Sequence, residues 1–407
     1  MLYRLEIENF WSVRDAQVLD VTVAPNVPDD EGRLGSIFPG SADRAPKVLV
    51  LYGPNASGKT TILRTLDFLA AFIRDSYQAT GPGFAACQRF NDAECENSPI
   101  RLAVEFGGVM DLSTMVVERQ AHDLPVEFGI YRYELEIGVV DGLPVHVLAE
   151  NLRQKPGGKG KWQRVFERTG GEVVGSKTFA MTGYRHLLNT LKPNVSALSS
   201  FAQFGHPTAT LFVEVARTVF SNLNLVPQGD DWTLKFFAQS PELTQKVQRD
   251  LSRIDVGIEG MRFIDTPNGP IPMFRHAGLA LEMPWYMESH GTRAFIRIFP
   301  FLSETLERGG VAILDEFDTM IHAAVLPDIL RWFYDSRRNP DDAQAWISVH
   351  SASLLDDLAK EQVVLCEKDS RGRTRVFSLM DVKAVRRDEN LYKKYLSGAF
   401  GALPNIG

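Results

Sequence analysis

One segment of the chain matches a phosphate-binding loop in residue types and spacing: Gly53, Pro54, Asn55, Ala56, Ser57, Gly58, Lys59 and Thr60. An apolar run at 48–51 precedes this loop and a helix-like stretch at 61–72 follows it. Glycines let backbone N–H groups close around phosphate oxygens, Lys59 can reach the β- and γ-phosphates, and Thr60 offers a hydroxyl to Mg²⁺. The helix that begins here, with Thr61 in its first turn, adds the positive end of its dipole. We therefore predict a strand, loop and helix that bind a nucleoside triphosphate.

Composition limits the class of protein around this loop. A chain of 407 residues with 44% hydrophobic and 23% charged residues can bury a large core and form two lobes. The first residues lack the pattern of a signal peptide, and no apolar run has the length needed to span a bilayer, so we expect a cytoplasmic location. Three cysteines without a CxxC pair predict reduced packing residues and neither a zinc site nor a disulfide framework.

Charge argues against a protein that coats nucleic acid with its whole surface, because the formal net charge is −7. Two local basic segments leave nucleic acid as a partner: 155–162 holds three lysines and a tryptophan, and 371–396 holds eight basic against three acidic residues. A solvated face is the more ordinary explanation of either segment, and contact with a nucleic acid stays an open alternative.

The spacing of apolar residues predicts β-rich and helical parts. Alternation predicts an antiparallel hairpin at 2–8 and 16–23, with further strands near 100–106, 113–118, 129–139 and 145–151. From about residue 184 the spacing becomes helical, as at 207–223 and 241–254. No heptad pattern persists over several turns, which argues against a long coiled coil.

Two carboxylates end an apolar run at 311–314. A buried parallel strand would deliver Asp315 and Glu316 at its carboxyl end, where ligands of α/β proteins bind. One carboxylate suffices to support Mg²⁺, and the second can act as a base toward water beside the γ-phosphate. We therefore predict that Asp315 joins Thr60 in the metal site and that Glu316 activates water for hydrolysis.

A second apolar strand, at 345–349, precedes His350, and a helix-like stretch opens near Ser289 and Gly291. An imidazole can donate to a phosphate oxygen and lose that contact when the phosphate leaves, so His350 is a candidate sensor of the γ-phosphate. Ser289 and Gly291 form a second helix start that could hold phosphate, although a serine and a glycine also make an ordinary helix cap. Because one chain rarely offers two helix ends to one γ-phosphate, we expect this segment to contact the ATP of a facing subunit.

The order of these motifs resembles the ABC-type ATPases of the SMC, RecF and OLD group. The resemblance rests on residues 5–10 with Ser12, the phosphate-binding loop, residues 289–292, Asp315-Glu316 and His350. His290 stands where an ABC signature has Gly. The resemblance implies a glutamine loop after the first helix, for which Gln88 is the nearest candidate, and a loop that signals between subunits at Asp318 and His322. The closer likeness is to single-chain ATP-binding proteins of abortive-infection and anti-phage loci, such as the RloA-like ATPases and the ATPase subunit of PARIS, and the tail at 367–404 carries much of it.

This resemblance implies an α/β P-loop NTPase: an ABC-type head with an antiparallel β subdomain, a helical insertion and no long coiled coil. Residues 1–175 would form the N-terminal part of the head, 176–284 a mainly helical insertion and 285–407 the C-terminal part. It also implies ATP and Mg²⁺ as cofactors, homo-oligomeric pairing of heads across ATP, and a separate effector such as a nuclease. Two alternatives stay open, a RecF-like DNA-repair ATPase that acts directly on DNA, and a non-hydrolytic ATP-bound scaffold for a partner protein.

Overall fold

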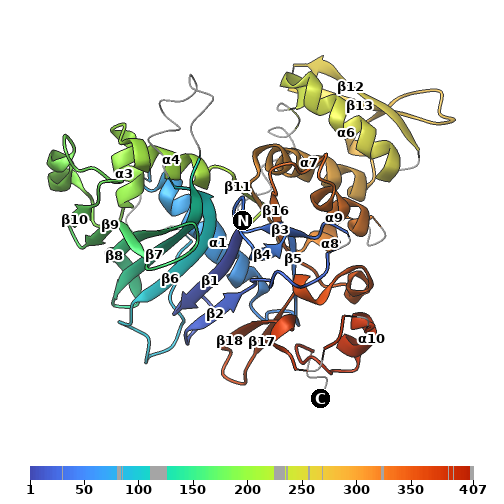
Figure 1. The fold of residues 1–407 in the computed structure, drawn as a ribbon. Helices are drawn as coiled ribbons and strands as arrows, with labels where there is room; N and C mark the ends of the chain where they lie inside the picture. Colours follow the sequence, from blue (N-terminus) through green and yellow to red (C-terminus); the bar gives the residue numbers. More distant parts are fainter. Residues whose placement is uncertain are drawn as a thin grey trace.

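The computed structural model describes residues 1–403 apart from 30, 80–83, 85, 111–125, 224–233, 235–236, 255–256, 268, 322–324, 384 and 388. Within these residues two large sheets stand side by side, and a smaller lobe lies beyond the central sheet (Figure 1). The strand predicted at 113–118 lies outside the described residues.

The central sheet positions the candidate site. Its strands lie in the order β11-β15-β16-β5-β17-β18. Their bounds are β5 (Val48–Tyr52), β11 (Val219–Ser221), β15 (Val311–Leu314), β16 (Gln344–Ser348), β17 (Val363–Lys368) and β18 (Thr374–Ser378). All neighbouring pairs are parallel except β17 with β18, which is an antiparallel hairpin. The carboxyl ends of the parallel strands therefore meet at one edge, which is where α/β sheets bind ligands.

The central sheet is buried on both faces, as its apolar strands predict. All five residues of β5 are buried, and their side chains alternate between two hydrophobic cores. Leu49 and Leu51 belong to the core shared with the larger antiparallel sheet, whereas Val48 and Val50 belong to the core on the opposite face. Rigid packing on both sides fixes the strand ends that carry the candidate site.

The antiparallel sheet forms the β subdomain that the sequence predicts. Its strands are β1 (Leu2–Glu8), β2 (Gln17–Asp20), β6 (Ile100–Val109), β7 (Phe128–Val140), β8 (Leu143–Pro156), β9 (Gln163–Thr169) and β10 (Glu172–Gly175). The predicted hairpin is confirmed by the antiparallel pairing of β1 with β2. Three helices fill the core between this sheet and the central sheet: α1 (Lys59–Asp75), α3 (Ala197–Gln203) and α4 (Pro207–Ala216). The expected P-loop α/β fold with an antiparallel subdomain is thus the fold observed.

The smaller lobe contains strands that the sequence did not predict. Helix α6 (Pro241–Ile254) has the predicted bounds, but it packs on a sheet of β12 (Ile258–Thr266), β13 (Gly269–His276) and β14 (Met283–Pro284). This lobe projects above α7 (His290–Arg308) in Figure 1. The chain that leads to it also differs from prediction, because the helix expected at 207–223 ends at Ala216 and β11 follows. Val219 and Phe220 favour extended backbone, and the edge of β15 supplies the hydrogen-bond partners that an isolated strand lacks.

The remaining elements close the fold around the two cores. They are the hairpin β3 (Leu34–Ser36) with β4 (Arg44–Pro46), the helices α8 (Phe317–Met320), α9 (Leu326–Tyr334) and α10 (Leu391–Leu396), and the 3₁₀ turns η2 (Arg185–Thr190), η3 (Trp285–Met287), η4 (Ala352–Asp357), η5 (Lys360–Gln362) and η6 (Leu379–Asp381). Helix α7, with 19 residues, is the longest described helix, and the described part of the chain contains no coiled-coil arm. None of the described helices is long and apolar enough to cross a bilayer.

Candidate functional site

The phosphate-binding loop joins the carboxyl end of β5 to the N-terminus of α1. Gly53 and Gly58 adopt positive φ angles of 151° and 105°. A Cβ on Gly53 would overlap the carbonyl of Cys366, and one on Gly58 would overlap the side chain of Thr374. Glycine is therefore required at both positions, because the backbone is left-handed there and neighbouring strands approach closely. Gly58 caps α1 without a side-chain hydrogen bond, which leaves the first N–H groups of the helix free for an anion.

Lys59 is a buried cation inside this loop. The residue is only 6% exposed, and its ammonium donates to the carbonyl oxygens of Gly53 at 2.8 Å and Pro54 at 3.2 Å. Burial lowers the pKa of Lys59, and the negative groups around it, Asp315 among them, oppose that effect. Ser57 nearby is 2% exposed and its hydroxyl has no hydrogen-bond partner among the described residues. A buried ammonium and an unpartnered hydroxyl both suit an anionic ligand with acceptor oxygens.

Asp315 lies directly beside Thr60, as the sequence predicts for a shared metal site. The Thr60 hydroxyl donates to Oδ2 of Asp315 at 2.8 Å, and the Ser348 hydroxyl donates to Oδ1. Ser348 also accepts a hydrogen bond from the backbone N–H of Glu316 at 2.8 Å. One serine at the end of β16 therefore fixes both predicted carboxylate residues. Sequence reasoning missed Ser348, although its place at the end of an apolar strand was a usable signal.

Glu316 and His350 approach each other at the mouth of the site. Oε1 of Glu316 lies 3.6 Å from Nε2 of His350, and the Glu316 side chain is 58% exposed. Glu316 has a φ of 51°, a left-handed conformation that costs free energy for a residue with a Cβ. Asp318 holds the strand end by accepting from the backbone N–H groups of His350 (2.8 Å) and Ser351. The Glu316 carboxylate is therefore exposed to solvent at the mouth of the site, where a water molecule can reach it.

A hollow of about 240 Å³ brings these groups together. Its lining comprises Ser12, Asn55, Ala56, Ser57, Gly58, Lys59, Thr60, Thr61, Asp315, Glu316, His350 and Lys368. Oxygen donors suit Mg²⁺, which is bound in proteins by one or two carboxylates together with phosphate oxygens and water. Thr60 and Asp315 supply two oxygen ligands side by side, which fits a metal that completes its coordination with phosphate oxygens and water. The described residues hold no group of three or more His, Cys, Asp or Glu side chains that could hold a metal ion.

Two further segments brace the loop from outside. The Ser12 hydroxyl lies 2.8 Å from the Thr61 hydroxyl, and Thr374 donates to Ser12 (2.8 Å) or to the carbonyl of Ser57 (2.9 Å). Ser12 follows β1 and Thr374 opens β18, so elements near both ends of the chain meet at the loop. No local pattern pointed to Thr374, because its contact with Ser12 joins residues 362 positions apart.

Other predicted residues lie away from this hollow. Ser289 caps α7 by accepting from the N–H of Thr292 at 3.0 Å, and Ser289 and Gly291 are exposed and do not line the hollow. Gln88 contributes its backbone carbonyl to the N–H of Trp11 at 2.9 Å, and its exposed side chain does not line the hollow either. His322 lies outside the described residues.

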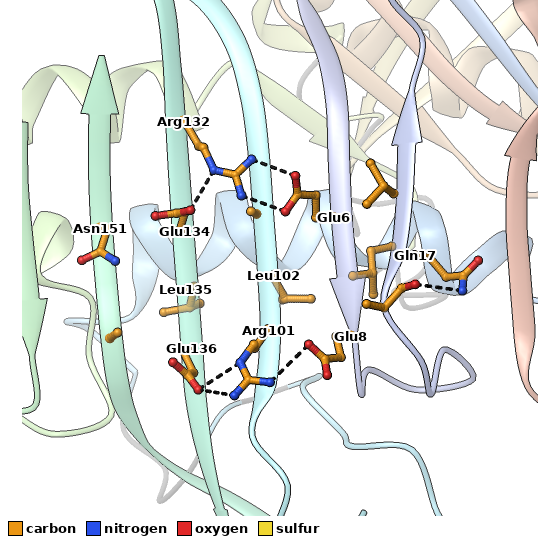
Figure 2. Close-up of a pocket in the computed structure, with 15 residues that line it drawn as sticks. Glu6, Glu8, Gln17, Arg101, Leu102, Arg132, Glu134, Leu135, Glu136 and Asn151 are labelled. Carbon is orange, nitrogen blue, oxygen red and sulfur yellow. Dashed lines mark hydrogen bonds and ion pairs between the residues drawn. The ribbon is translucent and has the colours of Figure 1, made fainter. Parts of the chain in front are cut away.

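The outer face of the antiparallel sheet carries a second hollow, of about 290 Å³ (Figure 2). Arg132 pairs with Glu6 and Glu134 at 2.7 Å, and Arg101 pairs with Glu136 at 3.0 Å. These arginines are neutralised by carboxylates of the same sheet, so this hollow lacks the free positive charge that phosphate requires. Part of the basic segment at 371–396 is also paired: Arg373 with Asp369 and Asp15, Arg387 with Glu361, and Lys394 with Glu389.

The segment that contains the phosphate-binding loop is similar to a known family of domains. A family model described as an AAA domain, putative AbiEii toxin, Type IV TA system matches residues 48–175, which run from β5 through the loop to β10. No curated protein matches the sequence. The part of the chain that contains Lys59 and Thr60 is therefore similar to an AAA domain.

Solved structures similar to the chain include SMC heads, all at low identity. An Smc head bound to the C-winged helix domain of ScpA has a TM-score of 0.46 at 10% identity and covers 92% of this chain and 97% of its own. The SMC head domain from Thermotoga maritima has a TM-score of 0.38 at 10% identity, with 93% and 98% covered. An Smc head with an extended coiled coil, bound to the C-terminal domain of ScpA derived from Pyrococcus furiosus, has a TM-score of 0.36 at 11% identity, with 93% and 96% covered.

Proposed function

We propose that the protein is a Mg²⁺-dependent ATPase whose heads pair across ATP and whose hydrolysis gates a separately encoded effector in anti-phage defence. The 2.8 Å contact between the Thr60 hydroxyl and Asp315 carries the ATPase part of the proposal. It joins the phosphate-binding loop to a carboxylate at the same edge of the central sheet, which is the arrangement that a metal–nucleotide substrate needs.

In this proposal the loop residues bind the triphosphate and Lys59 supplies the positive charge. Backbone N–H groups of the loop beyond Pro54, which itself has none, and the open N-terminus of α1 donate to phosphate oxygens. The Lys59 ammonium exchanges its two carbonyl partners for the β- and γ-phosphates. Thr60 and Asp315 would hold Mg²⁺, which neutralises charge that develops on the phosphates. The low exposure of Lys59 strengthens its attraction for a phosphate because little water screens it.

Hydrolysis would proceed at the outer end of the loop. Glu316 accepts a proton from a water molecule, the water oxygen forms a bond to the γ-phosphorus, and the bond from that phosphorus to the β–γ bridging oxygen breaks. The products are ADP and inorganic phosphate. His350, whose Nε2 lies 3.6 Å from Oε1 of Glu316, can donate to a γ-phosphate oxygen and steady the carboxylate. Loss of the γ-phosphate removes that contact, so His350 links hydrolysis to a change at the strand end.

Pairing of two heads would complete each site. Ser289 and Gly291 lie at the exposed N-terminus of α7 and do not line the hollow that contains the phosphate-binding loop of the same chain. Helix α7 is long enough to have a dipole at that end. In a symmetric pair, the start of α7 from one copy would contact the γ-phosphate held by the other.

The description of the matched family as a putative AbiEii toxin supports a role in abortive infection, and the resemblance to anti-phage ATPases suggests that a nuclease or similar effector is the gated partner.

The mass of the protein in solution, with and without ATP, tests head pairing. The Glu316→Gln variant should bind ATP without consuming it, so we expect its mass to double when Mg²⁺ and ATP are added. Lys59→Ala is the control, because it removes the phosphate-binding ammonium and should stay at its ATP-free mass. An unchanged mass of Glu316→Gln at saturating ATP would contradict head pairing. The ATPase part of the proposal is tested separately, by measuring ATP turnover.

Phage plating tests the defence role. Cells that carry this chain with its neighbouring genes should reduce the efficiency of plating, and Lys59→Ala should abolish that protection. If the isolated chain instead binds DNA tightly with a steep dependence on salt, a RecF-like role directly on DNA is favoured. If the native protein binds ATP without hydrolysing it, the alternative of a non-hydrolytic ATP-bound scaffold for a partner protein is favoured.

A further inference from the structure

Asn222 stands where the chain leaves the central sheet for the smaller lobe. It follows β11, a strand of three residues that joins the sheet through only three residue pairs with β15. The backbone N–H of Asn222 extends this ladder by donating to the carbonyl of Ile313 at 3.1 Å. Asn222 therefore lies at the same sheet edge as the candidate site, next to the strand that ends in Asp315.

The side chain of Asn222 pairs with the backbone of Asp315 in both directions. Nδ2 of Asn222 donates to the carbonyl oxygen of Asp315 at 3.0 Å, and Oδ1 accepts from the N–H of Asp315 at 2.8 Å. This exchange imitates a further pair of a β-ladder beyond the point where β11 stops. It requires an amide, because only an amide presents a donor and an acceptor side by side.

Asp315 is thereby held from two sides. Asn222 fixes its backbone, while Thr60 and Ser348 contact the two oxygens of its carboxylate. The contacts to the carboxylate depend on the position of the Asp315 backbone. Asp315 is the first residue after β15, so the strand ladder does not fix this backbone. Without Asn222 its N–H and C=O would have to find water at the sheet edge, and the direction of the carboxylate would loosen.

We propose that Asn222 is a positioning residue for the metal-binding carboxylate of Asp315. This inference rests on the proposed Mg²⁺–ATP site. Residues that orient metal ligands typically change metal affinity by about 10- to 100-fold when they are removed.

The test compares nucleotide binding with and without the metal. A fluorescent ATP analogue is titrated into native protein and Asn222→Leu, first with EDTA and then with Mg²⁺. Leucine has a similar shape and removes both hydrogen bonds. We expect metal-free affinity within about 2-fold of native and a Mg²⁺ enhancement reduced by at least about 10-fold, with a matching rise in the Mg²⁺ concentration that half-saturates turnover.

Asn339 provides a matched control because its amide also bridges backbone groups far from the site. Its Nδ2 donates to the carbonyls of Phe333 (2.8 Å) and Ala343 (3.0 Å), and its Oδ1 accepts from the N–H of Ala343. Asn339→Leu should lower thermal stability without changing the Mg²⁺ enhancement. Asn222→Ala serves as a second variant if leucine prevents folding, and it should show the same selective loss.

The outcomes separate this inference from the proposed function. An unchanged Mg²⁺ enhancement in folded Asn222→Leu or Asn222→Ala would overturn the positioning role alone. A loss of metal-free and metal-dependent binding in equal proportion would overturn it as well, because that result indicates general damage to the loop. Native protein that binds the analogue with no Mg²⁺ enhancement would overturn the proposed function and this inference together.

Discussion

The hydroxyl of Thr60 and the carboxylate of Asp315 lie 2.8 Å apart although 255 positions separate them in the chain. This contact arises because β5 and β15 run parallel with only β16 between them, so their carboxyl ends reach the same edge. The segments between the two residues include β6 to β10 of the antiparallel subdomain and the whole of the smaller lobe (Figure 1). A single hollow therefore contains both the phosphate-binding loop and the carboxylates.

Gly58→Ala should weaken nucleotide binding. Alanine at a φ of 105° is strained, and its Cβ would overlap Thr374, so the loop must shift. Strain of this kind costs about 1–3 kcal/mol, which corresponds to roughly a 5- to 150-fold loss of affinity. Equilibrium titration with a fluorescent ATP analogue measures it. Gly171→Ala is the control, since a Cβ there meets nothing within 4 Å; equal affinities for the two variants would contradict the predicted loop geometry.

Ser348→Ala should slow turnover more than it weakens ATP binding. The serine hydroxyl links Asp315 to the backbone of Glu316, and a hydrogen bond to a charged group contributes about 1.5–3 kcal/mol. We expect kcat to fall roughly 10- to 100-fold, with the Kd for ATP changed far less, as measured by steady-state hydrolysis and equilibrium binding. Ser397→Ala, at the end of α10, should behave as native. A native kcat in Ser348→Ala would show that this hydroxyl does not orient the site.

The ion pair of Glu6 with Arg132 should make stability depend on pH. Hydrogen bonds from Arg132 lower the pKa of Glu6 from 4.5 to about 2. Because the folded pKa lies below the unfolded one, the carboxylate stabilises the fold above pH 4.5, and this contribution is lost as the pH falls toward 2. Urea unfolding of native protein and Glu6→Gln should therefore differ most near neutral pH and converge below pH 4.5. A difference that is constant with pH would argue against this shift.

Glu150→Ala should destabilise the antiparallel subdomain strongly. Glu150 and Arg168 are fully buried, and Glu150 also accepts from Tyr133 (3.0 Å), Ser196 (2.6 Å) and the N–H of Ala197 (2.7 Å). Removing one partner leaves the Arg168 charge uncompensated, which typically costs about 3–5 kcal/mol.

Urea unfolding measures this cost against a matched control. In Glu167→Ala the lost carboxylate is 38% exposed and pairs with Arg153 and Arg164 on the surface, so its removal should cost below about 1 kcal/mol. Similar losses of unfolding free energy in both variants would show that the buried contacts of Glu150 do not stabilise the subdomain more than a surface ion pair does.

Local patterns predicted the parts of the site that sit at strand ends. Lys59, Thr60, Asp315, Glu316 and His350 follow or flank apolar runs, and parallel packing of those runs brings them to one edge. Asn222 could not be found this way, because its role depends on β11 pairing with β15 some 90 residues later. The apolar spacing at 207–223 suits a helix, and only the open edge of β15 makes its last residues a strand. Thr374 could not be found for the same reason, since its hydrogen bond to Ser12 joins residues 362 positions apart.

ATP turnover by Glu316→Gln, measured beside native protein at saturating ATP and Mg²⁺, tests the central claim most directly. The amide keeps the shape of Glu316 but cannot accept the proton of water, so we expect ATP affinity within about 2-fold of native and turnover at least ~100-fold lower. Turnover at the native rate would remove Glu316 from the role of base. Absence of ATP binding and hydrolysis in the native protein would contradict the account as a whole.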